Sequence, residues 1–513
     1  MTCISNKIDS NVTGLRFTEE ECIGILRTVG SVLPPPVWYT QEPNSYNNFG
    51  AKVTTVARNP INPSRQRKKG TVTDLASAGG YTQDCTAGNL VRLFQGFCFA
   101  NARQKASVQP LNGTQNSVSG VTAAAKTYTV SAGGAAFISG RLVFATNFTN
   151  AGNNGLKSVA SSTATTVVVN ETTVDEAAPP ANANLQVVGH QFAAGDLAVT
   201  MNAGSVYLNC TAADFTAMGF VVGEWIFIGG DVANSAFASF SGFARIGTIA
   251  AKQLLLDKIG WSAPAADPGT GKTVRLFYGT VIRNEDDPTL IVRKSYQLER
   301  SLGSDANGPQ YEYVVGAVPN EFTLTLKQAE KVTMDFTYVG TGYETNNGTI
   351  GPKAGTRPSS VIEDAFNTSS DFARIRMSQV VPGNPSPTPL FAFATDMTLT
   401  IKNNVNANKA IGILGAMDVS AGTFEVGGAS TVYFATVDAA AAVRNNADVT
   451  LDIIMVKKNA GLLFDIPLLT LGNGEATVAQ DQPIMLALDT NAAQSTFGNT
   501  LLFMHFPYLP NLA

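Results

Sequence analysis

The chain has 513 residues, of which 14% are charged, and its formal net charge is −4. Soluble proteins carry about 25% charged residues, so much of this surface is open to coverage by other polypeptide, such as further copies of the chain. The net charge argues against a nucleic-acid binder that works by bulk positive charge, and the 28 Phe and 13 Tyr argue against disorder.

No run of the sequence approaches the roughly 18 apolar residues that a membrane span needs. The first residues lack the apolar core of a secretion signal, so we expect synthesis in a cytoplasm. The five cysteines are odd in number and none of them forms a C-x-x-C pair, which argues against a disulfide framework and a zinc site. We therefore expect no membrane span, no metal and no cofactor.

Three helices are expected in an otherwise β-rich chain. The first is expected at 18–32, where Thr18 can cap and an apolar stripe follows. The second is expected from about 86 to 103 and a short third at 438–444. Nearly everything else alternates at period two between Gly, Asn and Pro turns, so the predicted fold class is mainly β.

The densest charge cluster is Arg65-Gln66-Arg67-Lys68-Lys69. Interleaved aromatic residues are absent from it, and the sequence has no basic stripe elsewhere, which weakens a nucleic-acid interpretation. We favour a contact with acidic groups of a neighbouring subunit, which would set the register of that subunit. A solvated loop and a nucleic-acid patch remain the alternatives.

A first internal repeat lies in the middle of the chain. The pattern Phe137-x-x-Gly140-x-Leu142-x-Phe144 returns as Phe220-x-x-Gly223-x-Trp225-x-Phe227, and Val159, Val167 and Val169 return as Ile246, Leu254 and Leu256. Each copy reads as strands joined by turns. The repeat predicts an inserted pair of small β-barrel domains at 125–190 and 191–275. Domains inserted in this way are expected to hang from a surface, so the rest of the chain should assemble without them.

A second, fainter repeat joins the flanking parts of the chain. Residues 323–326 and 332–334 match residues 423–426 and 432–434, and both stretches are expected to form hairpins with the same face apolar. This repeat predicts two copies of one β-sandwich or barrel domain. The first copy would comprise 1–124 and 276–345, and the second 346–513.

Catalytic patterns are scarce. His190 and His505 are the two histidines, and the sequence has no nucleophile elbow, zinc-binding helix or His/Cys cluster. Residues 269–273 mimic the end of a phosphate-binding loop, but Ala266 stands where that loop needs its first glycine. We interpret them as a hairpin turn and expect no enzyme.

One stretch carries a recognisable signature. Residues 59–84 read NPINPSRQRKKGTVTDLASAGGYTQD, and Leu93-Phe94-Gln95-Gly96-Phe97 follows on the second predicted helix. This succession of a basic loop, a Gly-Thr-Val-x-Asp-Leu strand, a Gly-Gly-Tyr-x-Gln-Asp turn and an apolar helix resembles tail tube proteins of phages with long, non-contractile tails. Ala76 departs from the signature, in which an acidic residue is expected at that place.

The resemblance implies a structural virion protein that polymerises into stacked rings and forms a conduit for DNA ejection. It implies assembly in the host cytoplasm, and as partners further copies of the chain, a tape measure protein, and tail terminator and distal tail proteins. Double-stranded DNA would pass through the lumen without specific binding. If each chain holds two tube domains, three chains complete a sixfold bore, so a trimeric ring is favoured over a hexameric one.

A conduit should not grip phosphates, because each Lys or Arg contact with phosphate adds affinity. We therefore expect a net negative lumen, with Glu321, Glu330, Asp335 and Glu425 as candidate lining residues. The alternative function is a decorating or adhesin-like virion protein with sugar-binding β-domains. A run of exposed Trp and Tyr in the inserted block would favour it, but the tryptophans there are only Trp225 and Trp261.

Overall fold

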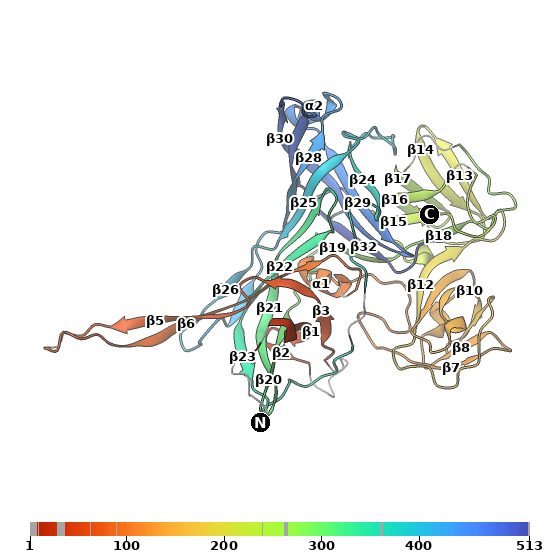
Figure 1. The fold of residues 1–513 in the computed structure, drawn as a ribbon. Helices are drawn as coiled ribbons and strands as arrows, with labels where there is room; N and C mark the ends of the chain where they lie inside the picture. Colours follow the sequence, from red (N-terminus) through yellow and green to blue (C-terminus); the bar gives the residue numbers. More distant parts are fainter. Residues whose placement is uncertain are drawn as a thin grey trace. The chain divides into compact units, whose positions relative to one another are not determined.

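The computed structural model describes residues 8, 10–27, 36–61, 63–88, 90–238, 240–260, 265–359 and 363–510. The chain divides into two compact units, each made of three stretches of sequence (Figure 1). The first unit comprises Met1–Phe99, Val292–Ser369 and Thr395–Ser430, and the second comprises Ala100–Ile291, Ser370–Ala394 and Thr431–Ala513. Antiparallel strands dominate both units, which confirms the predicted class.

The described part of the chain has two α-helices, α1 (Leu90–Phe97) and α2 (Asp438–Arg444). They confirm the third predicted helix and a shorter version of the second. The remaining helical turns are 3-10 in type: η1 (Ser10–Val12), η2 (Gly134–Ala136), η3 (Ala151–Asn153) and η4 (Thr216–Met218).

The first predicted helix, at 18–32, is wrong. Its start lies in strand β1 (Gly14–Cys22), which β2 (Ile25–Leu26) follows, and residues 28–32 lie outside the described part of the chain. Leu15 and Phe17 are fully buried two residues apart, which is the spacing of a strand face. Pairing with β3 and β20 therefore overrides the local helical pattern.

In the first unit, the remaining strands come from all three stretches of its sequence and pair with one another. They are β3 (Tyr39–Gln41), β4 (Pro43–Tyr46), β5 (Gly50–Arg58), β6 (Lys68–Asp84), β20 (Tyr296–Asp305), β21 (Gly308–Lys327), β22 (Thr333–Gly340), β23 (Gly342–Asn346), β25 (Ala394–Lys402), β26 (Asn406–Asn408) and β27 (Asp418–Ser420), and β28 (Glu425–Tyr433) begins in this unit. The long strand β21 pairs with β20 and β23 over its first half. Its second half pairs with β22 and β25.

Helix α1 covers the apolar face of the second half of β21. Its Phe94 and Phe97 rings lie 4.9 and 5.8 Å from the ring of Phe322 on β21. Phe97 also packs against Phe336 on β22, with 5.8 Å between ring centroids. The apolar helix stripe of the sequence thus supplies the core of this unit.

The second unit contains a twelve-stranded sheet. Its strands are β7 (Val118–Thr122), β8 (Thr127–Val130), β9 (Arg141–Thr146), β10 (Gly155–Ser162), β11 (Thr166–Val169), β12 (Asn184–Gln191), β13 (Leu197–Asn202), β14 (Ser205–Cys210), β15 (Trp225–Ile228), β16 (Gly242–Ala250), β17 (Gln253–Ile259) and β18 (Arg275–Phe277). The order across the sheet is β13-β14-β17-β16-β15-β18-β12-β9-β10-β11-β8-β7. This order is symmetric: each of the strands β7–β12 has a counterpart six numbers later, and the two sets follow the same order inward from opposite edges of the sheet.

The first sequence repeat occupies equivalent places in this sheet. Val159 opposes Val169 in β10 and β11, and Ile246 opposes Leu256 in β16 and β17. Before each copy's central strand stands a glycine with positive φ, Gly140 or Gly223. The Gly140 N–H donates to the carbonyl of Val159 at 3.0 Å, and the Gly223 N–H donates to that of Ile246 at 2.8 Å.

The other strands of the second unit are β19 (Thr280–Arg283), β24 (Phe372–Gln379), β29 (Val449–Lys457), β30 (Ala460–Thr477), β31 (Met485–Ala492) and β32 (Leu502–Phe506). They share one apolar core with the twelve-stranded sheet. Buried residues of both groups form a single cluster, to which the second group contributes Ile454, Leu463, Leu502, Met504 and Phe506. The inserted block is therefore built into its unit and does not hang from a surface as expected.

One strand plan occurs in both units. In the first unit, β1-β20-β21-β22 pair in succession, and β23 returns to β21. In the second, β24-β29-β30-β31 pair in succession, and β32 returns to β30. A matching irregularity marks both: Tyr296 and Leu298 oppose Ala317 and Val314, as Val449 and Leu451 oppose Leu469 and Ile466.

The second predicted hairpin of the fainter repeat, at 423–434, is wrong. Residues Glu425–Tyr433 form the single strand β28, whereas 323–326 and 332–334 do pair within β21 and β22. Gly428 lies inside β28, where a Cβ would stand 1.9 Å from the carbonyl oxygen of Thr398 on β25. The glycine is needed for this close approach of two strands and does not mark a turn.

Candidate functional site

The β5–β6 hairpin, here called the arm (residues 50–77), extends away from the other strands of the first unit (Figure 1). The predicted contact residues gather at its end: Arg65, Gln66 and Arg67 lie in the tip loop, and Lys68 and Lys69 begin β6. All five side chains are exposed. The structure thus places the one dense cationic cluster of the sequence at the far end of a projecting hairpin.

The arm also exposes apolar side chains. Val53, Val56 and Val72 are 54%, 57% and 48% exposed. A lone two-stranded hairpin is only marginally stable in water, and an open strand edge is a template for pairing with another chain. The root of the arm is fixed within its own unit by an ion pair between Asp74 and Lys409. The arm therefore presents exposed cationic and apolar side chains on a projecting hairpin.

A polar face spans the strands on which two of the predicted lumen acids lie. One row of opposed residues crosses four strands: Thr82 of β6, Asp335 of β22, Thr323 of β21 and Thr400 of β25. Thr82 donates a hydrogen bond to the carboxylate of Asp335, and the hydroxyls of Thr323 and Thr400 lie 3.2 Å apart. The opposite face of these strands carries the buried Phe322 and its apolar neighbours.

Acids outnumber bases on this polar face. In the next row Glu321 opposes Lys402, with 4.0 Å between their charged atoms. Side-chain alternation places the following charged residues on the same face: Asp84, Glu321, Asp335, Asp396, Lys327 and Lys402. Thr, Asp and Glu side chains make it a hydrated surface with a net negative charge.

The other two predicted lumen acids lie outside these rows. Glu330 is exposed in the turn between β21 and β22. Glu425 is exposed at the start of β28, next to the buried Val426. Because side chains alternate along a strand, Glu425 faces the same way as Ala429. The backbone N–H of Ala429 donates a hydrogen bond to the hydroxyl of Thr398, a residue of the polar face.

The repeated strand plan identifies two acids that sequence reasoning missed. Glu475 of β30 and Asp489 of β31 are exposed on the strands that correspond to β21 and β22. The neighbouring Leu486 and Leu488 are buried, so Asp489 lies on the outward face of its strand. In the sequence, the leucines at 486 and 488 indicate a strand with one apolar face. Only the repeated strand plan shows that this strand corresponds to β22 of the first unit.

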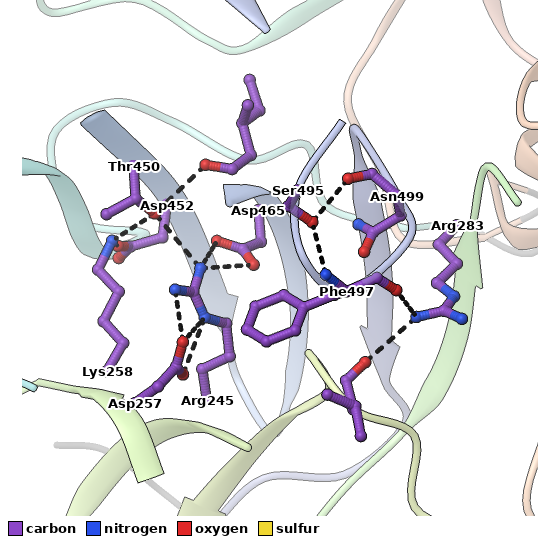
Figure 2. A network of polar contacts seen from close by, with 12 residues as sticks. Arg245, Asp257, Lys258, Arg283, Thr450, Asp452, Asp465, Ser495, Phe497 and Asn499 are labelled. Atoms are coloured by element: carbon purple, nitrogen blue, oxygen red, sulfur yellow. Dashed lines mark hydrogen bonds and ion pairs between the residues drawn. The ribbon is translucent and has the colours of Figure 1, made fainter. Parts of the chain in front are cut away.

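A buried ion cluster joins the inserted block to the C-terminal strands of the second unit (Figure 2). Arg245 of β16 lies 2.9 Å from Asp257 and 3.1 Å from Asp465, and Lys258 of β17 pairs with Asp452. Arg374 of β24 also pairs with Asp452. Both Asp452 and Asp465 are 0% exposed.

Thr450 ties the two cations of the cluster together. Its hydroxyl accepts hydrogen bonds from Arg245 at 3.3 Å and from Lys258 at 3.2 Å. Burial lowers the pKa of Lys258 to about 8, while Asp452 acts in the opposite direction. Burial raises the pKa of Asp465, although Arg245 opposes this shift. The cluster is a structural one, because its charges are matched by one another.

In the described part of the chain, His190 and residues 269–273 are explained by packing and by a turn. His190 is 7% exposed, and burial, with Arg141 nearby, lowers its pKa to about 4. Residues 269–273 form a turn before β18, and Lys272 pairs with Asp267 at 2.5 Å. The described residues hold no cluster of three or more acidic, His or Cys side chains that could bind a metal. None of the helices in the described ranges has the length and apolarity of a membrane crossing.

The aromatic residues of the inserted block do not form an exposed sugar platform in the part that the structure describes. Trp225 and Tyr128 are 0% exposed, and Trp261 lies outside the described residues. The large apolar residues that the block exposes are Ile138, Val174, Met201 and Val232. These are aliphatic and do not provide the aromatic faces that favour sugar stacking.

Comparison with known proteins identifies the family. No curated protein matches the chain. A family model described as phage tail tube protein matches residues 11–492, a range that includes the arm, the polar face, the inserted block and every strand of the repeated plan except β32. The chain therefore belongs to the phage tail tube protein family and is a structural protein of the phage tail.

Proposed function

We propose that copies of this chain polymerise into stacked rings and form the tube through which DNA leaves the virion. One observation carries the proposal beyond family membership: the same strand plan occurs twice in one chain, on β20–β22 and on β29–β31. A structural protein with two copies of one module can supply two adjacent positions of a ring.

The ring would contain three chains. Three chains with two modules each place six modules around the bore, whereas a subunit with one module would need six chains. The trimeric ring thus has pseudo-sixfold symmetry, and a hexameric ring is the alternative. The ends of a ring differ, so rings stack through a heterologous contact that does not close and a filament grows.

The arm would provide the contact between copies. Its tip residues Arg65–Lys69 are cationic and exposed, and its valines lack cover in the single chain. Acidic groups of a neighbouring copy would pair with the tip and set the register of that copy.

The lumen would be lined by the polar face of the first unit and its counterpart in the second. Glu321 and Asp335 would face the bore in the first unit, with Glu330 and Glu425 near its edge, and Glu475 and Asp489 in the second. Such a wall repels phosphates and keeps a water layer, so DNA passes without being held. The tape measure protein would occupy the lumen before DNA, and tail terminator and distal tail proteins would close the ends after assembly in the host cytoplasm. A decorating or sugar-binding role has no support from the aromatic residues of the inserted block.

Electron microscopy of the purified full chain tests the proposal. Rings or tubes with an open bore are expected at high protein concentration. A protein that stays a folded monomer under all conditions that polymerise other tube subunits would contradict it.

A further inference from the structure

Strand β25 shows how one module can join the next. The second half of β21 is flanked on both sides, by β22 and by β25. The β25 pairing is antiparallel and runs from Glu321 opposite Lys402 to Lys327 opposite Asp396. In chain order, β25 follows β24, the first strand of the second copy, and precedes α2. By its order in the chain it is therefore a strand of the second copy, although it pairs with a strand of the first.

The equivalent edge of the second copy has no partner strand among the described residues, although helix α2 packs against β30 near Gly474. Strand β30 pairs with β29 up to Leu469 and with β32 up to Asp465. Beyond that point, residues 470–477 pair with β31 on one side, and no described strand pairs with them on the other. Asn473, Glu475 and Thr477 are exposed. An open edge of this length is a template for a further strand.

Strand β5 is the counterpart of β25. When β7–β19 and β26–β27 are left out, the order β5, β6, α1, β20, β21, β22 matches the order β25, β28, α2, β29, β30, β31. Within the described residues β5 pairs with β6 alone, and its side chains are exposed from Lys52 to Arg58. Its free edge corresponds to the edge by which β25 holds β21.

We propose that β5 of one copy adds antiparallel to residues 470–477 of β30 in the next copy. This pairing repeats between chains what β25 does to β21 within a chain, and it rests on the proposed ring assembly. Each chain then offers one open edge on β30 and one free edge on β5, which is the arrangement of a head-to-tail contact that closes into a ring. Lys52 and Arg58 on β5 suit Glu475 on β30, since β5 itself carries no acid.

Hydrogen exchange of the full chain before and after assembly gives the first test. Amides of 470–477 and of β5 should gain protection in rings, whereas those of β25 and of 321–327 should already be protected in the single chain. The latter two segments serve as internal controls. Rings that form while 470–477 stays unprotected would overturn the inference and leave the proposed function standing, and failure of all assembly would overturn both.

Disulfide capture tests which strands meet. In a Cys22→Ser background, Ala476→Cys is combined in turn with Lys52→Cys, Thr54→Cys and Val56→Cys. Opposed residues of antiparallel strands have Cα atoms roughly 4.5–5.5 Å apart, which suits a disulfide. One combination should give covalently closed rings under oxidation, and loss of the product on reduction should follow.

The matched control replaces Ala476→Cys by Thr325→Cys, on the edge that β25 already covers. It should give no covalent ring. Assembled rings that fail to link with any of the three cysteines on β5, or that link equally well through Thr325→Cys, would contradict the proposed pairing.

Discussion

Arg245 of β16 and Asp465 of β30 lie 3.1 Å apart, although 220 residues separate them in the chain. Asp465 also opposes Asp452 directly across the β29–β30 pair. Two like charges at opposed positions are unfavourable, and both carboxylates are fully buried. Arg245 and Lys258 of the inserted block therefore offset the repulsion between these two aspartates of β29 and β30.

Replacing Arg245 by methionine should destabilise the second unit strongly. The change removes the cation that pairs with Asp465 and keeps an apolar side chain of similar length. The free energy of unfolding should therefore fall by the amount typical of a broken buried ion pair, about 3–5 kcal/mol. Urea unfolding of the full chain measures it. The exposed Lys402 pairs with Glu321 at 4.0 Å, so Lys402→Met should change the free energy of unfolding by less than about 1 kcal/mol.

Addition of Asp465→Leu to Arg245→Met should recover part of the lost stability, because the buried charge left without its partner is then gone. A single Arg245→Met variant as stable as the original chain would show that the cluster does not join the block to β30.

Deletion of residues 125–275 should prevent the second unit from folding. The deletion removes Arg245 and Lys258 from two buried aspartates and uncovers Ile454 and Leu463 of the shared core. We expect an insoluble or proteolytically sensitive product. A soluble deletion variant with cooperative unfolding and normal tubes would contradict the shared core and favour a block that hangs from a surface.

Reversal of charge at the arm tip should weaken polymerisation and leave the fold unchanged. Arg67→Glu with Lys68→Glu alters two exposed residues, and such changes usually cost less than about 0.5 kcal/mol of stability. Sedimentation and tube length measure the effect. The matched variant Lys126→Glu with Lys252→Glu alters two cations of the inserted block and should polymerise normally. Tubes of normal length from the arm variant would eliminate the proposed role of the tip.

A positive lumen should retain DNA. Glu321→Lys with Asp335→Lys adds cations to the polar face, so polymerised tubes should bind double-stranded DNA at low salt and release it as the salt concentration rises. Filter binding of assembled tubes measures the retention. Glu21→Lys changes an exposed acid of β1 and serves as the control. Equal DNA binding by both variants and the original tubes would remove these acids from the lumen.

Strong local patterns were readable in the sequence. The first repeat was found because Gly140 and Gly223 hold the same positive φ before equivalent strands, and such positions favour glycine. The helix expected from about 86 to 103 is predicted because Phe94 and Phe97 recur at helical spacing, and the structure forms it over Leu90–Phe97. The cationic tip was found because its five residues are contiguous.

Non-local pairing was not readable. The stretch after Thr18 has a helical pattern, but its strand is fixed by β20, which lies far along the chain. The fainter sequence repeat predicts the second copy at 423–434, whereas the repeated strand plan includes β29–β31. Equivalent residues such as Val314 and Ile466 share only apolar character. Their correspondence is therefore visible in the strand register but not in the amino-acid sequence.

The symmetry of the ring shows whether the two copies of the strand plan occupy separate positions around the bore. Two copies of the strand plan in each chain predict a ring of three chains with six similar modules around the bore. Cryo-electron microscopy of assembled rings, with native mass spectrometry of a single ring, measures both numbers. Three chains with pseudo-sixfold density are the predicted result, and a ring of six identical chains would contradict the account.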